Sequence, residues 1–390
     1  MFKFLRKLVL GPAYFYHVHL IKKSKRWSRS NIENYQAQKI TTLDVDFTTK
    51  DDIRNNPDMY LRKSLFVPIR QVRTGGTSGT PFKFFQDLFF TRQKERAYLF
   101  DIWRDVGYKG FDYKIVVRGN MPKKAIAYDM INNSLVISQN YFVEEHRAHI
   151  VELFSKKACF LHVYPSTLLF LVEFFGDDTF QKFPIKGVLA GSEAFPIEQM
   201  TWFKKKFDVP IAHWYGHSEY AILARFCHNC KEFHFYPTYG KMDLLKEDHD
   251  YKILATGFQR YGTQFRRYFT GDFAKPSQND CQLDNYNKVH AIVGREQDFI
   301  FDNKGVKRAF GPYLFGIHNE FWDYILDIQF IQKTKGNIEV KFVVSKEFNE
   351  IAFKTIIKDR FELYNVQFIR VEQIEKTVSG KHVYFRQQVQ

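Results

Sequence analysis

Five short segments of the chain carry glycine, hydroxyl and charged side chains, and they follow one another in a fixed order. The first is the glycine- and threonine-rich stretch 74–81, and the last is Ser-Gly-Lys at 379–381, close to the C-terminus. Between them lie Tyr-Gly-His-Ser-Glu at 215–219, Thr-Gly-Asp at 270–272 and Gly-Arg-Glu-Gln-Asp at 294–298. Each segment alone occurs by chance. Taken together, they predict that distant stretches of the chain fold around one ligand.

In this order, the five segments resemble those of adenylate-forming ligases, which join ATP to a carboxylic acid. The nearest branch looks like the phenylacetate-CoA ligase group and its CapK-like relatives in capsular polysaccharide biosynthesis. The resemblance covers most of the chain from about residue 70 onward. It implies an α/β fold, with a large N-terminal adenylate-forming domain of mixed sheets and helices and a small C-terminal α+β domain.

The length of the chain indicates two domains. A chain of 390 residues exceeds one ordinary hydrophobic core, and 45% hydrophobic residues are sufficient for two cores. The sequence changes in character after Gly294 and Arg295. We therefore expect a large ATP- and acyl-binding domain over residues 1–296 and a small mobile domain over residues 297–390.

Apolar runs and amphipathic stretches predict the elements of both domains. Helical spacing predicts helices over 88–106, 198–207 and 348–364. Short apolar runs that end at turn signals predict buried strands at 114–117, 186–191 and 210–214, which is typical of an α/β sheet. In the small domain, we expect a hairpin of strands 327–332 and 338–345, and a last strand at 366–371.

The charge and the N-terminus limit the partners. A formal net charge of +15 implies an anionic partner: a nucleotide, CoA, an anionic lipid or nucleic acid. The basic residues are dispersed and no DNA- or RNA-binding motif is present, which argues against nucleic acid. Pro12, His17 and His19 interrupt the apolar N-terminal run, so we expect no transmembrane helix. Four cysteines in a chain of this length, without a cleavable signal, are typical of cytosolic thiols or metal ligands, so we expect a cytoplasmic protein. Residues 1–29 could lie on an anionic membrane surface or pack on their own domain.

The segment 74–81 suits the phosphates of ATP. Glycine lets backbone N–H groups approach phosphate oxygens closely, and hydroxyl groups add donors. The family pattern has a lysine where Thr80 stands, and Lys83 lies two residues after Pro81. An ordinary hairpin turn is the alternative. The phosphate-binding residues implied by the resemblance are Thr74, Gly75, Gly76, Thr77, Ser78, Gly79 and Thr80.

Two segments match those that enclose adenine in the family. The resemblance implies that Glu219 holds Mg²⁺, a hard cation that prefers carboxylate and phosphate oxygens. The alternative is a solvated glutamate at a helix start. His217 could meet the substrate carboxylate. The residues implied to bind the nucleotide here are Gly191, Ser192, Glu193, Tyr215, Gly216 and Ser218, with Tyr215 near the adenine.

Asp272 and Arg295 match the ribose-binding residues of the family. Two carboxylate oxygens suit a vicinal diol. For Arg295, a surface ion pair is the alternative. Gln297 aligns with the pivot about which related enzymes turn the small domain after adenylation.

Lys381 matches the mobile lysine that neutralises the charge that develops as a carboxylate attacks the α-phosphate. A flexible cation after a glycine suits this role, and a basic C-terminal tail is the alternative. The resemblance thus implies that Lys381, Glu219 and His217 are catalytic.

Four side chains have the chemistry of a zinc site. Cys227 and Cys230 are separated by two residues, His234 follows, and Cys281 lies further along. This spacing suits tetrahedral zinc, although the second half is not a matching pair, and buried free thiols are the alternative. We expect such a zinc ion to brace the loop after Glu219.

The resemblance predicts an ATP- and Mg²⁺-dependent ligase that forms an acyl-adenylate and passes the acyl group to CoA or an amine, in surface polysaccharide biosynthesis. An inactive nucleotide-binding or scaffold homologue is one alternative. A zinc-stabilised basic protein that binds anionic polymers is another. Candidates for the acyl pocket, with core packing as their alternative, are Phe142, Tyr164, Pro165, Ser166, Trp214 and His217.

Overall fold

The computed structural model describes residues 10–40, 46–73, 82–118, 125–247, 250–281, 285–295, 299–305, 307–310, 324–344, 348–375 and 383–389. The glycine-rich segment 74–81, Gln297 and Lys381 lie outside these residues. For Arg295, only the backbone is described.

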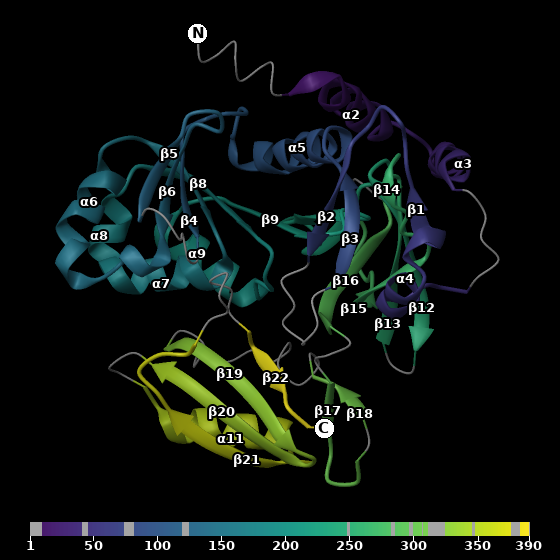
Figure 1. Cartoon of the computed structure of the whole chain (residues 1–390). Helices are drawn as coiled ribbons and strands as arrows, with labels where there is room; N and C mark the ends of the chain where they lie inside the picture. Colours follow the sequence, from purple (N-terminus) through teal and green to yellow (C-terminus); the bar gives the residue numbers. More distant parts are fainter. Residues whose placement is uncertain are drawn as a thin grey trace.

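One 12-stranded sheet runs through the large part of the molecule (Figure 1). Its strand order is β12-β13-β15-β16-β11-β10-β9-β8-β7-β4-β6-β5. In chain order the strands are β4 (Lys114–Arg118), β5 (Ile126–Asp129), β6 (Ser134–Ser138), β7 (Cys159–Val163), β8 (Ile185–Gly191), β9 (Ile211–Gly216), β10 (Leu223–Cys227), β11 (Glu232–Phe235), β12 (Gly240–Glu247), β13 (Asp250–Gly257), β15 (Tyr268–Pro276) and β16 (Lys288–Arg295).

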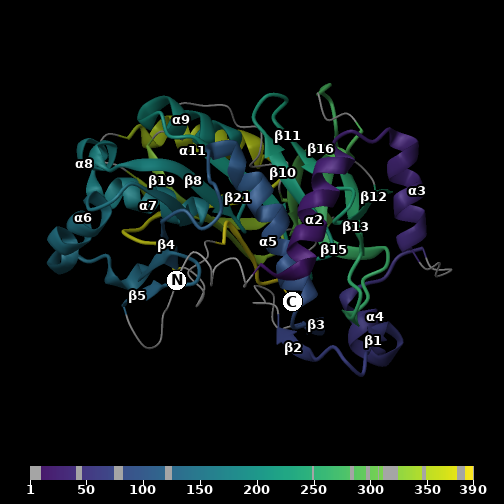
Figure 2. The same cartoon turned by 90° about the horizontal axis from the view of Figure 1, so that it is seen from above.

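The sheet has a parallel half and an antiparallel half. From β6 to β9 the neighbours pair in parallel, and from β9 to β12 they pair antiparallel. Helices pack around the parallel half (Figures 1 and 2), where α9 buries Met200, Phe203 and Phe207 at helical spacing. These helices are α6 (Arg147–Ser155), α7 (Pro165–Phe175), α8 (Asp177–Lys182) and α9 (Ile197–Phe207). The predicted strands at 114–117, 186–191 and 210–214 and the helix at 198–207 are confirmed.

A second, four-stranded sheet of order β1-β14-β3-β2 carries the hairpin that contains the glycine-rich segment. In β2 and β3, Arg73 lies opposite Lys83. Gly262 has a φ of +87°, and an added Cβ would lie 2.4 Å from the carbonyl oxygen of Phe85, so only glycine fits there. The elements of this region are α4 (Lys50–Asn55), β1 (Leu61–Arg62), β2 (Ile69–Arg73), β3 (Lys83–Asp87) and β14 (Gly262–Thr263).

The helix α2 (Gly11–Ser24), the first that the structure describes, lies beside α5 (Phe90–Trp103) in both views (Figures 1 and 2). It is followed by α3 (Arg29–Lys39). Tyr14 and Ile21 of α2 are buried in a core that they share with α5. This agrees with the alternative in which the first helix packs on its own domain, and contact with a membrane stays a prediction. Among the described helices, none is long and apolar enough to cross a bilayer.

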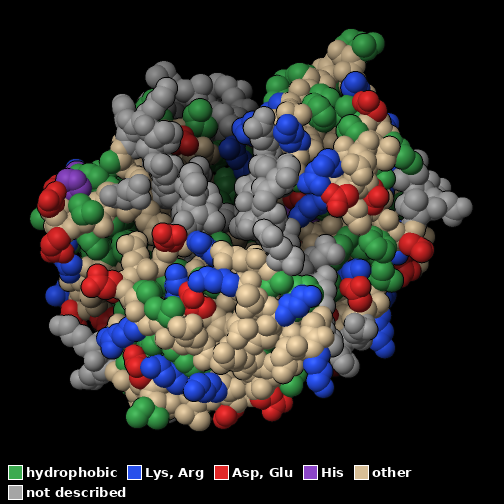
Figure 3. Space-filling model, turned by 60° about the horizontal axis from the view of Figure 1, so that its bottom comes forward, with side chains coloured by type: hydrophobic (Ala, Val, Ile, Leu, Met, Phe, Trp, Pro, Cys, Tyr) green, Lys and Arg blue, Asp and Glu red, His purple; other side chains and the backbone are tan. Residues whose placement is uncertain are grey.

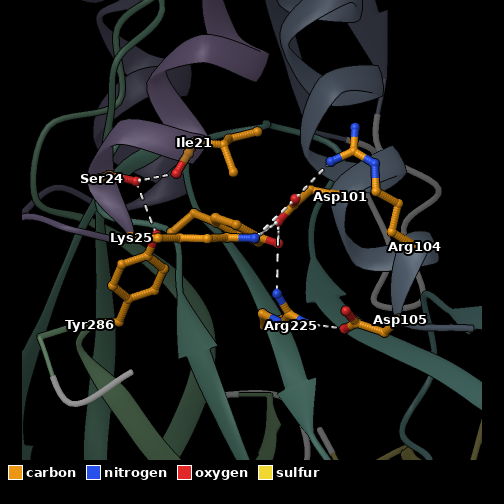
Figure 4. Close-up of polar contacts among 9 residues, drawn as sticks. Ile21, Ser24, Lys25, Asp101, Arg104, Asp105, Arg225 and Tyr286 are labelled. Atoms are coloured by element: carbon orange, nitrogen blue, oxygen red, sulfur yellow. Dashed lines mark hydrogen bonds and ion pairs between the residues drawn. The ribbon is translucent and has the colours of Figure 1, made fainter. Parts of the chain in front are cut away.

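A buried carboxylate joins the end of α2 to the sheet (Figure 4). The side chain of Asp101, on α5, is 4% exposed. It lies 3.0 Å from Lys25 Nζ, 3.2 Å from a nitrogen of Arg104 and 3.7 Å from a nitrogen of Arg225 on β10. The hydroxyl of Tyr236 donates to it at 2.8 Å. One charge therefore links two helices and a strand of the large sheet.

The C-terminal part has a sheet and a core of its own. Its sheet order is β21-β20-β19-β22, and Phe330, Val340 and Phe353 are among its fully buried side chains. The predicted hairpin, helix and strand are confirmed, and the three-residue β22 was not predicted. β19 lies against α7 of the large part. The elements are β17 (Phe299–Phe301), β18 (Lys307–Ala309), β19 (Ile325–Thr334), β20 (Asn337–Val344), α11 (Glu350–Arg360), β21 (Asn365–Arg370) and β22 (Phe385–Gln387).

These elements confirm the predicted fold class, an α/β chain with a small C-terminal α+β unit. The helix predicted over 88–106 is α5, which is shorter at both ends. The boundary predicted near Gln297 stays a prediction, because that residue lies outside the described part of the chain.

Candidate active site

The segment 215–219 leaves the sheet where parallel pairing ends. Tyr215 and Gly216 close β9, and the chain then turns into β10, its antiparallel neighbour. Two amide side chains hold this turn. Gln86 Nε2 donates to the carbonyl of Ser218 at 2.8 Å, and Gln259 Nε2 donates to the carbonyl of Glu219 at 2.8 Å. Since these amides come from other elements, the tertiary fold fixes the conformation of the turn.

Glu219 is a buried and ionised carboxylate. His217 Nδ1 lies 3.1 Å from its Oε2, and the hydroxyl of Tyr268 donates to its Oε1 at 3.1 Å. Burial raises the pKa of Glu219, but the hydrogen bond and charge of His217 and the charge of Lys50 outweigh burial and lower this pKa to about 2. With only 5% of the residue exposed, Glu219 is not the solvated glutamate of the alternative interpretation. A buried carboxylate of this kind is a suitable ligand for Mg²⁺.

The two ring nitrogens of His217 differ in their surroundings, because only Nδ1 lies next to Glu219. The other nitrogen, Nε2, is buried and lacks a hydrogen-bond partner within the part of the chain that the structure describes. A buried polar atom without a partner costs about 1–3 kcal/mol. Such an atom is a candidate contact for a ligand oxygen.

Asp272 and Tyr215 bring two of the predicted segments into contact. The hydroxyl of Tyr215 donates to Asp272 Oδ2 at 2.6 Å. Asp272 is 8% exposed and follows Gly271, which has a φ of +84°. In the pairing of β15 with β16, Asp272 stands opposite Arg295. Asp272 and Arg295, the two residues predicted to bind the ribose, therefore lie directly opposite each other on neighbouring strands.

The hairpin with the glycine-rich segment lies beside these residues. The ring of Phe82, which follows that segment, stacks on the ring of Tyr268 at a centroid distance of 6.3 Å. Tyr268 in turn donates to Glu219. Phe82, the first described residue after the glycine-rich segment, therefore packs at the carboxylate site, while residues 74–81 themselves lie outside the described part of the chain.

The segment 191–193 lies next to the same turn, because β8 pairs in parallel with β9 and Gly191 stands opposite Trp214. An added Cβ at Gly191 would lie 2.3 Å from the indole of Trp214, so the position requires glycine. The Glu193 carboxylate accepts the N–H of Ser166 at the start of α7, at 3.1 Å. This contact suits an acidic side chain at a helix N-terminus. A nucleotide contact for Glu193 stays a prediction.

Some residues that were predicted to line the site are buried in hydrophobic cores instead, and others are not described. Phe142 and Trp214, candidates for the acyl pocket, are buried in hydrophobic cores at 6% and 7% exposure, as their alternative interpretation expected. Lys381 and the side chain of Arg295 are not described, so their roles stay predictions.

Four residues at this site were not predicted from the sequence. Tyr268 precedes the Thr-Gly-Asp motif, and its place in that segment could have indicated a role. Nothing in the sequence connects Lys50, Gln86 or Gln259 to the turn at Glu219, since they come from α4, β3 and the connection between β13 and β14.

The four predicted zinc ligands meet at the end of β10 that lies away from Glu219, so the expectation that a zinc ion here braces the loop after Glu219 is wrong. The ligand atoms of Cys227, Cys230, His234 and Cys281 all lie within 4.8 Å of one another. The fourth residue, Cys281, comes from the connection between β15 and β16.

Solved structures of ligases share this architecture. 2-Hydroxyisobutyryl-CoA ligase in the postadenylation state, in complex with 2-HIB-AMP, matches with a TM-score of 0.57 and 12% identity over 99% of this chain and 88% of that chain. The chain has the fold of acyl-AMP-forming ligases. The GH3.15 acyl acid amido synthetase matches with a TM-score of 0.52 and 13% identity, over 84% of this chain and 79% of that chain.

A third match is the anthranilate CoA ligase AuaEII in complex with anthranoyl-AMP, with a TM-score of 0.51 and 13% identity over 80% of this chain and 64% of that chain. No protein-family model matches the sequence, and no curated protein does. At such low identity the likeness concerns the fold.

The lowered pKa of Glu219 predicts a pH-dependent contribution to stability. The ordinary pKa is 4.5 and the folded value is about 2. The contribution is therefore complete above about pH 4.5 and is lost as the pH falls toward 2. We expect His217→Phe to lower the free energy of unfolding by about 1–3 kcal/mol at pH 7, with the difference shrinking below pH 4. Denaturant titrations at several pH values measure it.

The exposed His149 supplies the control for this prediction. His149→Phe should change stability little at any pH. A difference between His217→Phe and the original protein that stays constant from pH 7 to pH 3 would contradict the coupling to Glu219.

Proposed function

We propose that this protein is an ATP-dependent ligase that activates a carboxylic acid as an acyl-adenylate and transfers the acyl group to CoA or to an amine. One observation carries the proposal: the ionised Glu219 and the Asp272–Tyr215 pair converge beside the glycine-rich hairpin. They do so in the fold of ligases whose solved structures contain acyl-AMP. The CoA ligases and the amido synthetase among the similar structures support both kinds of acceptor.

In the first half-reaction, an oxygen of the substrate carboxylate attacks the α-phosphorus of ATP. The bond from that phosphorus to the bridging oxygen breaks, and pyrophosphate leaves. Asp272 accepts hydrogen bonds from the ribose hydroxyls, Arg295 lies across from it, and the 74–81 loop donates to the phosphates. Glu219 would hold Mg²⁺, which when bound neutralises phosphate charge. His217 Nε2 is available to the substrate carboxylate.

Lys381 brings the further positive charge that the transition state needs. In the second half-reaction, the small domain turns about Gln297, and a thiol or amine attacks the acyl carbonyl and releases AMP. Figure 3 shows Lys and Arg side chains dispersed over the face that bears the small domain. The phosphates of CoA would meet part of this positively charged surface.

The pathway follows from the resemblance to CapK-like proteins, and we propose surface polysaccharide biosynthesis. A peripheral position at the inner face of the membrane would fit such a role, because basic residues follow α2. Pelleting of the protein with anionic vesicles, compared with a variant that lacks residues 1–29, tests this part. Equal pelleting contradicts it.

An exchange assay tests the central reaction. We expect the protein to exchange labelled pyrophosphate into ATP in the presence of Mg²⁺ and one class of acid, in a screen of aryl acids, amino acids and uronic acids. Reactions without an acid are the control. ATP binding without exchange for any acid supports the inactive nucleotide-binding or scaffold homologue. A protein that does not bind ATP contradicts both proposals.

A further inference from the structure

We propose that Cys227, Cys230, His234 and Cys281 bind one structural zinc ion that holds together the far ends of strands β10, β11 and β16. The proposal does not depend on the ligase activity, because it rests on a cluster at the other end of β10 from Glu219. All four ligand atoms lie within 4.8 Å of one another, and all four residues are buried or half-buried.

The distance between two of the sulfur atoms matches tetrahedral zinc. Two thiolates that each lie about 2.3 Å from a tetrahedral zinc ion are about 3.8 Å apart. The Sγ atoms of Cys227 and Cys281 are 3.7 Å apart, and Cys230 Sγ lies 3.1 Å from His234 Nε2. A disulfide requires sulfur atoms about 2.05 Å apart. Cys227, at the end of β10, and Cys281, in the connection between β15 and β16, are therefore spaced for a shared metal.

The donor set favours zinc and a structural role. Three thiolates and one imidazole in a tetrahedron are typical of structural zinc, whereas catalytic zinc keeps a position for water. The protein supplies all four donors here. The backbone N–H groups of Asn229 and Cys230 also donate to the sulfur of Cys227, as suits a thiolate ligand.

A buried carboxylate prearranges the cluster. Glu232, between Cys230 and His234 in the sequence, is fully buried and accepts the hydroxyl of Ser277 at 2.6 Å and the N–H of Gln278 at 2.8 Å. It also accepts the N–H of Asn279 at 3.0 Å. These bonds hold the chain just before Cys281 against the β10–β11 hairpin.

A further hydrogen bond holds the segment before Cys281 to the turn between β10 and β11, because Asn279 Nδ2 donates to the carbonyl of Cys230 at 3.0 Å. Cys281 is therefore brought to the other ligands by protein contacts alone. A site that is assembled before the metal arrives binds it without a large ordering cost.

The place of the cluster in the sheet defines what the metal does. β10 runs from the turn after Glu219 to Cys227, and β16 runs from the connection after Cys281 to Arg295. Zinc would thus fix the ends of two strands whose opposite ends carry predicted nucleotide contacts. Loss of the zinc ion should loosen the sheet and lower the stability of the protein. The ion itself would take no direct part in the reaction.

Metal analysis of the full-length protein, purified without a His tag and without chelators, tests the proposal. We expect about one zinc per chain. Cys281→Ser should lose most of it, whereas Cys159→Ala should keep it, because Cys159 is a fully buried thiol in another core. A zinc content near zero in the original protein, grown with added zinc, overturns the proposal.

Two further measurements cover the case in which Cys281→Ser does not fold. Replacement of the metal in the original protein by Co²⁺ should give the intense absorption of a tetrahedral thiolate complex, and an octahedral spectrum would overturn the assignment. Removal of the metal with a chelator should lower Tm by about 5 °C or more. Unchanged Tm after complete removal overturns the bracing role. Metal content, the Co²⁺ spectrum and Tm are all measured without the exchange assay. They therefore test the zinc site even if the protein has no ligase activity.

Discussion

Replacing Lys381 with alanine is expected to reduce the rate of adenylation by about 10²–10³-fold, with little change in ATP affinity. The reason is that its ammonium group would meet charge that develops only as the carboxylate attacks the α-phosphorus. An interaction made mainly in the transition state lowers kcat and leaves ground-state binding nearly intact. Pyrophosphate exchange at saturating ATP measures the rate, and nucleotide titration measures the affinity.

Lys376 supplies a matched control, because it belongs to the same segment, 375–381. Lys376→Ala removes the same charge from the same stretch and should keep most of the exchange activity. Transfer from a chemically prepared acyl-adenylate to the acceptor should also survive in Lys381→Ala, because that step no longer involves the α-phosphate attack. Unchanged exchange in Lys381→Ala, or an equal loss in Lys376→Ala, would remove the assignment.

The parts of the fold that local pattern determines were predictable. β8 and β9 are apolar runs bounded by turns, and α9 and α11 show apolar side chains at helical spacing, so local sequence was sufficient. The order of the 12-stranded sheet and the short β22 were not predictable. Both depend on pairing between distant strands, and a three-residue strand has no periodicity to recognise.

The same division holds for the candidate site. Motif order was sufficient to expect Tyr215 and Asp272 around one ligand, and their hydrogen bond is consistent with it. The place of Tyr268 next to the Thr-Gly-Asp motif could have indicated a role, but neither its bond to Glu219 nor the charge of Lys50 beside Glu219 could be read from the sequence. These contacts arise from tertiary packing, and the low pKa of Glu219 follows from them rather than from its motif.

The largest effect on stability is expected at Asp101, whose carboxylate joins α2, α5 and β10 (Figure 4). Asp101→Asn should lower the free energy of unfolding by about 3 kcal/mol. The substitution keeps the size of the side chain but removes the charge opposite Arg225, whose side chain is only 14% exposed. Lys25 and Arg104 are more than one-third exposed and contribute less, because water screens them. Denaturant unfolding at neutral pH measures the change.

Asp105 separates this effect from a general loss of negative charge. It also contacts Arg225, but its side chain is 37% exposed, so Asp105→Asn should cost about 1 kcal/mol or less. Equal losses of stability in the two variants would mean that either carboxylate alone is sufficient to pair with Arg225. The burial of Asp101 would then not determine how much it contributes to stability. A larger loss at Asp101 would show that the N-terminal helix is anchored through this carboxylate. That outcome would show that α2 stabilises the part of the chain that contains the 12-stranded sheet, since Lys25 at the end of α2 pairs with the same carboxylate.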